Sequence, residues 1–184
     1  MDSLAGQILI AIPDLPDSNF YRSVVIMLQH SHEGGTGVIL NRPSNVTVST
    51  VWDEISEEET CNSNEKINVG GPVEGPLIAL HTSPSLAETE IIPGVYMSVR
   101  RDNLNSLVNQ DQEQYRIFSG YSGWGSGQLE SEIECGGWLT LRAKKSDIFG
   151  ETESLWKNSC EHVGHKIMMP HMSRKSIPID PSRN

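Results

Sequence analysis

The sequence predicts a single compact α/β domain, built on a mixed β-sheet that contains an antiparallel hairpin and is flanked by helices. Three observations support this fold class. The chain has 184 residues, a length that fits one domain. Short apolar runs rich in β-branched residues alternate with segments of helical periodicity, as expected of a sheet with helical cover. No internal repeat or break in composition divides these segments.

Strands and a hairpin are predicted at the start of the chain. We expect a first strand at residues 7–12. Residues 23–28 form a nearly unbroken apolar run, SVVIML, which indicates a central strand covered on both faces. The turn HSHEGG follows, and residues 37–40 return as the second arm of a hairpin. Pro43 then holds the residue before it extended and closes this segment.

The middle of the chain mixes short helices and strands. Apolar residues at positions 48, 51, 52 and 55 have helical spacing, which predicts a helix near residues 50–55. Strands are expected at residues 67–69, 77–81 and 95–99. Asp102 is then expected to cap a short helix with one apolar face.

The second half should add two strands, two helices and a tail. A strand at residues 116–119 leads into a glycine-rich corner and its helix, and residues 138–142 form another strand. The last helix is expected to run from a Ser154 cap to a stop at Gly164. Residues 170–184 contain three prolines and little apolar content. We therefore predict a domain over residues 1–169 and a loose tail over residues 170–184.

Charge and cysteine content narrow the classes of function. The net charge is -10, so the chain as a whole repels the phosphate backbone of nucleic acids, and direct DNA binding is not expected. The three cysteines include no C-x-x-C pair, which suits a reducing compartment and predicts neither a disulfide nor a structural zinc. With no apolar stretch near the roughly 20 residues that span a bilayer, we expect a cytoplasmic protein.

The glycine-rich corner at residues 120–127 has four glycines in eight residues, and it could serve three purposes. A phosphate-binding loop would need a lysine where Gln128 stands, and three glutamates begin the helix that follows. A nucleophile elbow would need a glycine where Trp124 stands. A structural corner is therefore the favoured interpretation.

The structural interpretation makes a specific prediction about the helix start. Either Gly125 or Ser126 can cap the helix. If Gly125 is the cap, Trp124 and Leu129 are placed as a hydrophobic staple. The remaining alternative is a functional surface, on which a partly exposed pair of Tyr121 and Trp124 would anchor a ligand or a protein partner.

Histidines are the other candidates for chemistry. His30 and His32 lie two residues apart at a strand end, with Glu33 nearby, and His81 ends another predicted strand. Such spacing can bind zinc, but a closed zinc site takes about four ligands. Hydrogen-bonded histidines are the favoured interpretation, and no metal site is predicted.

The loop before the central strand carries Asp14, Asp17 and Arg22 around Phe20. These charges could form an ion-pair latch. Because surface ion pairs add little stability, the purpose of such a latch would be shape or recognition. Gly70 and Gly71, followed by a proline, have the composition of a turn.

Several blocks together resemble the YqgE/AlgH family of bacterial proteins. They are LIAIPDLPDSNFYRSVVIMLQH, GGTGVILNRP, VGGPV followed by LHT, and GYSGWGSGQLESEI with GGWL beyond it, in that order between residues 6 and 169. The resemblance implies one compact α/β domain and the label of transcriptional regulator. No catalytic residues are established for the family, so none are transferred. Its characteristic positions here are Asp17, Phe20, Arg22, Ser23, His30, Asn41, Pro43, Gly70, Gly71, Pro72, His81, Gly120, Tyr121, Trp124, Gln128, Leu129 and Glu130.

We therefore expect a regulatory or interaction protein that acts through a protein partner or a small ligand, with no catalytic residue, cofactor or metal. The alternative is an enzyme or ligand sensor with a pocket near residues 120–127. A direct DNA-binding regulator is less favoured, because no helix-turn-helix pattern is present. The candidate functional surface comprises Asp17, Arg22, His30, Asn41, Gly70, Gly71, His81, Tyr121, Trp124, Gln128 and Glu130.

Overall fold

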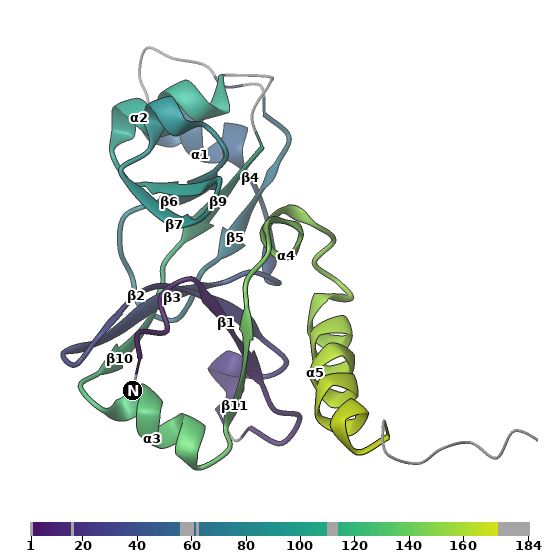
Figure 1. Ribbon diagram of the computed structural model, residues 1–184. Helices are drawn as coiled ribbons and strands as arrows, with labels where there is room; N and C mark the ends of the chain where they lie inside the picture. The colour runs from purple at the N-terminus through teal and green to yellow at the C-terminus, as the bar shows by residue number, and fades with distance from the viewer. Residues whose placement is uncertain (1, 16, 56–60, 62, 110–113, 173–184) are drawn as a thin grey trace, which may run out of the picture.

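Two β-sheets packed against each other form the centre of the molecule (Figure 1). The computed structural model describes residues 2–15, 17–55, 61, 63–109 and 114–172. Sheet A has the strand order β10-β3-β2-β1-β11 and sheet B the order β4-β5-β9-β6-β8-β7. The predicted mixed α/β class is confirmed, with the strands divided between two sheets. Every pair is antiparallel except β5 with β9, which is parallel.

In the sequence, all strands of sheet B lie between the third and the fourth strand of sheet A. Sheet B is contiguous in sequence and consists of β4 (Pro43–Thr47), β5 (Lys66–Val69), β6 (Ile78–His81), β7 (Thr89–Ile92), β8 (Val95–Ser98) and β9 (Tyr115–Ser119). Sheet A is assembled from both sides of this segment, from β1 (Gln7–Ala11), β2 (Val24–Ser31), β3 (Gly34–Ile39), β10 (Ser122–Gly125) and β11 (Trp138–Arg142).

Strand β2 is covered on both faces, as its apolar run predicts. Val24 and Ile26 point into a core shared by the two sheets, whereas Val25 and Met27 point into a second core on the other face of sheet A. This alternation is the period of two expected of a strand. The predicted hairpin with β3 is also confirmed.

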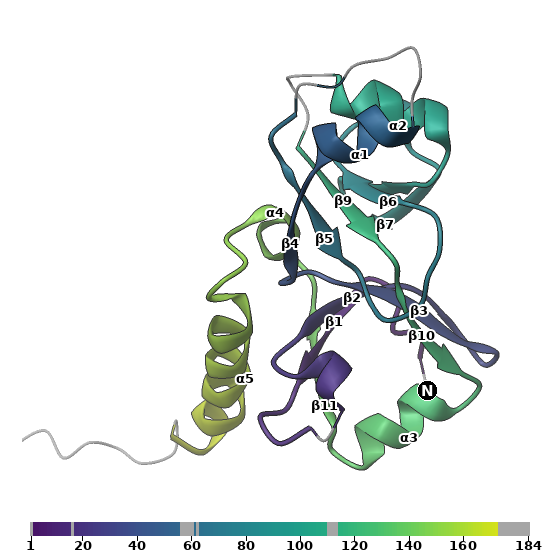
Figure 2. The same cartoon turned by 180° about the vertical axis from the view of Figure 1, so that it is seen from behind.

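The helices close the two outer faces and one side of the molecule. Their bounds are α1 (Val48–Ile55), α2 (Arg101–Val108), α3 (Gln128–Glu134), α4 (Lys145–Phe149) and α5 (Leu155–Met172), with 3-10 turns η1 (Ser18–Phe20) and η2 (Pro84–Leu86). Helices α1 and α2 cover sheet B, and α3 and η1 cover sheet A on the opposite side (Figures 1 and 2). Helices α4 and α5 lie beside the sheets and add Ile148, Leu155 and Val163 to the shared core.

The predicted end of the last helix is wrong. Helix α5 continues through Gly164 to Met172. An isolated glycine costs a helix only about 1 kcal/mol relative to alanine, so it does not end a helix by itself. The predicted boundary after residue 169 therefore falls within α5, and residues 173–184 of the predicted tail lie outside the described residues.

The predicted cap of α2 is also wrong. The helix begins at Arg101, with Arg100 as its N-cap, one residue before Asp102. No side chain caps the helix. Glu88, from the segment before β7, instead fixes the residues that lead into it: its Oε1 accepts the backbone N–H groups of Val99 at 3.1 Å and Arg100 at 2.9 Å.

Candidate functional site

The loop between β1 and β2 carries a residue in an unfavourable backbone conformation. Asp17 caps η1 by accepting the Asn19 N–H at 2.7 Å. Arg22 follows with φ at +51°, and in the described part of the chain it is the one non-glycine residue at positive φ. For a side chain with Cβ this conformation costs about 1–2 kcal/mol, and such residues cluster at functional sites.

Asn41 and Arg42 hold this loop in place. The Asn41 side chain accepts the Val24 N–H at 2.9 Å and donates to the Arg22 carbonyl at 2.9 Å. The Arg42 guanidinium donates to the carbonyls of Asn19 and Tyr21. Burial lowers the pKa of Arg42, and the charge of Asp17 opposes that shift. The backbone around Arg22 is therefore fixed from both sides.

The Arg22 side chain lies between two aromatic rings. Its guanidinium carbon is 5.1 Å from the centre of the Tyr21 ring and 5.2 Å from that of Trp156, within the range of cation–π attraction. Trp156 is fixed by its indole N–H, which donates to the Ala11 carbonyl at 2.8 Å. Tyr21 is 53% exposed. Asp17 and Arg22 make no ion pair with each other, so the predicted latch is replaced by this stack.

An open pocket of about 710 Å³ adjoins the stack. We call the exposed region formed by Tyr21, Arg22, Asn41, Trp156 and Lys157 the Arg22 surface. Residues lining the pocket are Arg22, Asn41, Glu151, Glu153, Ser154, Trp156 and Lys157. Two positions predicted as candidates, Arg22 and Asn41, therefore meet at one surface, and residues of α5 complete it.

The glycine-rich corner is a strand followed by a tight turn. Residues 122–125 form β10, and the helix cap is Gly127, at φ +70°, so the predicted caps at Gly125 and Ser126 are wrong. The Gln128 side chain accepts the Gly125 N–H at 3.0 Å and thereby joins strand and helix. The predicted structural corner is present, but Gly123 and Gly125 lie in the strand and not in the turn.

Trp124 is an inward side chain of β10, as is Ser122, and it is 6% exposed. Its ring stacks on Phe20 at 5.8 Å and meets Trp138 edge-on at 6.0 Å. It shares a core with Leu129. Because Gly127 is the cap, however, Trp124 and Leu129 are not at the N′ and N4 positions, and the predicted hydrophobic staple is wrong. Because Trp124 is buried, it is not the partly exposed anchor of the alternative interpretation.

Glu132 was not among the candidates, yet it organises this aromatic cluster. Its Oε2 accepts the indole N–H of Trp124 at 3.0 Å and that of Trp138 at 2.8 Å. Gln128 donates to its Oε1 at 2.9 Å. The spacing of Gln128 and Glu132 by one helical turn was a usable signal, because such side chains are neighbours on a helix.

Gly70 and Gly71 lie at the junction of the two sheets. The Gly70 carbonyl accepts the Ile39 N–H at 2.8 Å and the Ser122 hydroxyl at 3.1 Å. A Cβ on Gly70 would collide with the Gly120 carbonyl, and one on Gly71 would collide with the Tyr121 backbone. These two glycines therefore allow close backbone contact between the sheets.

His30 joins the start of the chain to α3. Its Nδ1 accepts the Leu4 N–H at 3.2 Å, which leaves the ring proton on Nε2. Nε2 lies 3.2 Å from the Glu130 carboxylate, a close contact that is not aligned as a hydrogen bond. The side chain of His30 is 3% exposed and that of Glu130 is 25% exposed. His30 is therefore a structural residue that lies between the N-terminal segment and α3.

His81 lies in the other sheet and is fully buried. Its Nε2 contacts the Ser98 hydroxyl at 3.0 Å, and Ser98 donates to the Leu86 carbonyl at 2.5 Å. A serine beside a histidine is the geometry of an activated nucleophile, but both side chains are 0% exposed and a substrate cannot reach them. The structure does not bring His81 and His30 together, and no cluster of metal ligands forms among the described residues.

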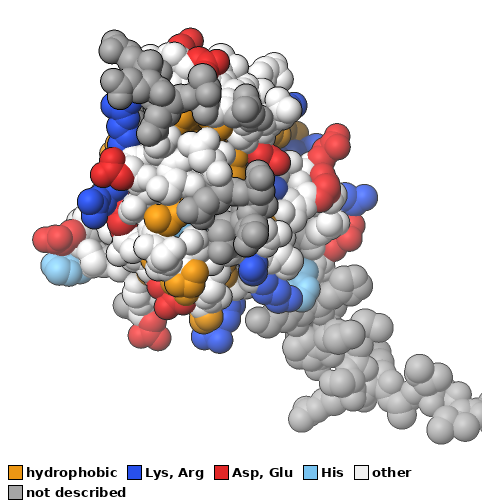
Figure 3. Space-filling model, turned by 90° about the horizontal axis from the view of Figure 1, so that it is seen from above, with side chains coloured by type: hydrophobic (Ala, Val, Ile, Leu, Met, Phe, Trp, Pro, Cys, Tyr) orange, Lys and Arg blue, Asp and Glu red, His pale blue; other side chains and the backbone are white. Residues whose placement is uncertain are grey.

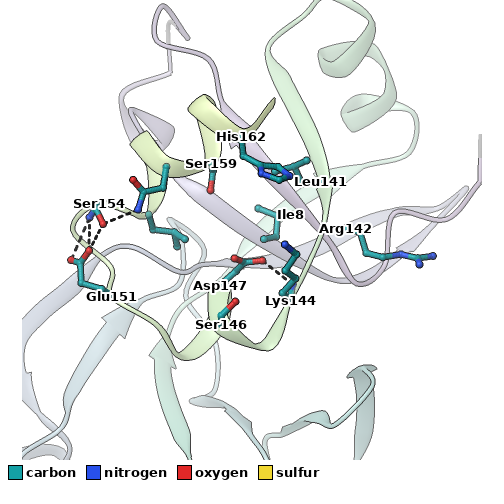
Figure 4. A pocket seen from close by; sticks show the side chains of 12 residues that line it. Ile8, Leu141, Arg142, Lys144, Ser146, Asp147, Glu151, Ser154, Ser159 and His162 are labelled. Carbon is teal, nitrogen blue, oxygen red and sulfur yellow. Dashed lines mark hydrogen bonds between the residues drawn. The ribbon is translucent and has the colours of Figure 1, made fainter. Parts of the chain in front are cut away.

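Two further pockets lie elsewhere on the molecule. One, of about 320 Å³, lies between β11, α4 and α5 (Figure 4). There Asp147 accepts the Lys144 N–H at 2.8 Å, Glu151 is bonded to Ser154, and Arg142 points away. The other pocket, of about 460 Å³, adjoins the glycine corner and is lined by Gln29, His30, Ser31, Glu33, Gly34, Gly35, Thr36 and Trp124.

Comparison with known proteins identifies the family. The AlgH-like family model matches residues 8–168. The chain belongs to the AlgH-like family. A "UPF0301 protein" of Myxococcus xanthus is 36% identical over 178 residues, which cover 95% of this chain and 98% of the relative. Another from Shewanella loihica is 36% identical and covers 91% of this chain and 95% of the relative.

Two solved structures share the fold described above. The solution structure of AlgH from Pseudomonas aeruginosa has a TM-score of 0.73 and 24% identity over 96% of each chain. A crystal structure from Corynebacterium diphtheriae has a TM-score of 0.71 and 23% identity over 88% of each chain. At these identities the likeness shows the fold alone. Among the helices of the described residues, none is long and apolar enough to cross a membrane.

Proposed function

We propose that this AlgH-like protein is an interaction protein, and that its Arg22 surface binds a protein partner. The observation that carries the proposal is the strained backbone of Arg22, fixed by Asn41 and Arg42. This conformation holds a guanidinium between an exposed tyrosine and a tryptophan. Tyr, Trp and Arg are the side chains that contribute most at protein interfaces.

Folding does not require a strained residue at position 22. A glycine at position 22 would adopt the same φ without the penalty, since only a side chain makes positive φ costly. An arginine at this position therefore fits a role in recognition better than a role in folding. The role in transcription that the family label suggests is consistent with such a partner, because a regulator can act by binding another protein.

The test separates stability from binding. Partners are captured from native lysate on the immobilised protein, identified, purified and titrated against three proteins: the parent, Arg22→Gly and Arg100→Ala. Arg22→Gly is expected to unfold within about 1 kcal/mol of the parent, since relief of strain offsets the lost ring contacts. It should bind the partner at least about tenfold more weakly. Arg100→Ala, a change of an exposed arginine near α2, should bind normally.

The proposal fails if Arg22→Gly binds a purified partner as tightly as the parent. If substitutions in the pocket at the glycine corner weaken partner binding instead, the interface lies at that corner. Recovery of a bound small molecule displaced by Arg22→Gly would favour a ligand sensor using the same surface.

A further inference from the structure

A small polar pocket lies between sheet B and the segment that leads into α5. Its volume is about 230 Å³. Strands β5 and β9 form its floor, and Thr152 of the segment before α5 closes one side. The lining residues are Pro43, Asn64, Glu65, Lys66, Asn68, Tyr115, Arg116, Ile117 and Thr152.

Arg116 is the main cation of this pocket. Its guanidinium donates from Nη1 to the Leu40 carbonyl at 3.3 Å and from Nη2 to the Gly150 carbonyl. A guanidinium has five N–H donors, so these bonds leave part of it unused. Burial lowers the pKa of Arg116, and the charge of Glu65 opposes that shift. Within the described chain, no carboxylate forms an ion pair with it.

The surroundings of Arg116 favour a negative group. A partly buried charge without an ion pair in direct contact is costly, and an anion bound to it would reduce that cost. Lys66 is an exposed lining residue of the pocket. Asn68 is buried, and its side-chain amide already donates to the carbonyls of Lys66 and Ile117. The lining holds two cations, Arg116 and Lys66, and one carboxylate, Glu65, although the whole chain carries a net charge of -10.

We propose that this pocket binds a small oxyanion, a phosphate or a carboxylate group, with Arg116 and Lys66 supplying the charge. The size of the pocket fits a single group, because whole small-molecule ligands usually occupy about 300 Å³ or more. Planar N–H donors of arginine match the oxygens of either anion. This site is separate from the Arg22 surface and does not depend on its function.

The experiment titrates the full chain with inorganic phosphate and, separately, with acetate at matched ionic strength. Binding is followed by NMR through the amide signals of β5 and β9 and the side-chain Nε–H of Arg116. We expect saturable shifts at this pocket with at least one of the two anions. Binding of phosphate alone identifies the site as one for phosphate groups, and binding of acetate alone identifies it as one for carboxylates.

Matched variants test which residues hold the anion. Lys66→Gln should weaken binding by about threefold to tenfold, and Glu65→Gln should strengthen it by a similar factor, because each changes one charge at the rim. Lys157→Gln, on the Arg22 surface, should leave the affinity unchanged. Arg116→Lys should abolish binding while thermal melting verifies that the variant remains folded.

Two results would overturn the proposal. One is the absence of saturable shifts with both anions. The other is an affinity that responds equally to Lys66→Gln and Lys157→Gln, since that would show a general effect of charge. If Arg116→Lys fails to fold, the opposite responses of the Lys66 and Glu65 variants still decide the question. Partner binding is measured separately, so its failure leaves this result intact.

Discussion

At the scale of single residues, Glu132 shows how one side chain can organise a cluster of aromatic rings. Replacing it by alanine leaves the indole N–H groups of Trp124 and Trp138 without their acceptor. An unsatisfied buried donor costs about 1–3 kcal/mol, so Glu132→Ala should lower the free energy of unfolding by about 2–4 kcal/mol. Urea melts followed by tryptophan fluorescence measure this loss. Glu134→Ala, exposed on the same helix, should change it by less than about 0.5 kcal/mol.

Trp124 itself should be needed first for folding. Its ring is buried against Phe20, Trp138 and Leu129. Truncation to alanine should therefore cost about 3–5 kcal/mol in urea melts. Glu130→Gln should cost under about 1 kcal/mol, because the carboxylate lies at a partly exposed helix start. A Trp124→Ala protein that melts like the parent but loses a partner would show that this residue serves binding.

Individual site residues could be predicted only in part. Asp17, Arg22 and Asn41 were identified through their motif blocks. Their meeting with Trp156 was not predictable, because it depends on where α5 docks against sheet A. Glycine spacing likewise gave a structural corner but not its cap, since a strand and a turn use the same residue types.

At the scale of elements, three glycines should respond differently to alanine. Gly164 lies in α5 with open space around it, so Gly164→Ala should raise the free energy of unfolding by about 0.5–1 kcal/mol. Gly127→Ala meets no neighbour but keeps positive φ, and should lower it by about 1–2 kcal/mol. Gly70→Ala places a methyl group against the Gly120 carbonyl and should cost about 3 kcal/mol or more. Chemical denaturation would order the three, and the reverse order for Gly70 and Gly127 would contradict the tight sheet junction.

The hydrogen bonds that Glu88 accepts at the start of α2 should make stability depend on pH. Burial raises the pKa of this carboxyl, but hydrogen bonds from Arg100, Asn103 and Val99 outweigh it, and the folded-state pKa lies below its usual value of 4.5. The contribution is therefore present above pH 4.5 and is lost as pH falls through the lowered value. Urea midpoints at about pH 6 and about pH 3 should differ less for Glu88→Gln than for the parent. An equal reduction in the surface control Glu74→Gln would refute this cause.

The elements that the sequence predicted well are those with strong apolar patterns. Strand β2 and its hairpin, β6, β8 and β11 all carry apolar residues with strand spacing. Three strands had no such signal: β4 begins with a proline, β7 is largely exposed, and β10 alternates glycines with other residues. Their conformation is set by neighbouring strands, which local sequence does not report.

At the scale of the whole molecule, the distribution of charge opposes nucleic-acid binding. The net charge is -10, and on the face shown in Figure 3 basic and acidic side chains are both scattered over the surface. We predict that the isolated protein shows no site-selective binding to DNA. A mobility-shift assay with genomic fragments at low and physiological salt tests this. A salt-sensitive complex at nanomolar protein with one sequence and not with others would contradict it.

The nesting of sheet B within sheet A has a consequence for the protein's emergence from the ribosome. Every strand of sheet B lies between residues 43 and 119, so that sheet is complete in sequence before β10 and β11 have been made. Until those two strands are made, the sheet of β1, β2 and β3 has two unpaired edges. One is β3, which later pairs with β10, and the other is β1, which later pairs with β11. Open edges invite pairing with other chains. We therefore expect the chain to be most prone to aggregation during its synthesis, until residues 122–142 have been made and complete sheet A.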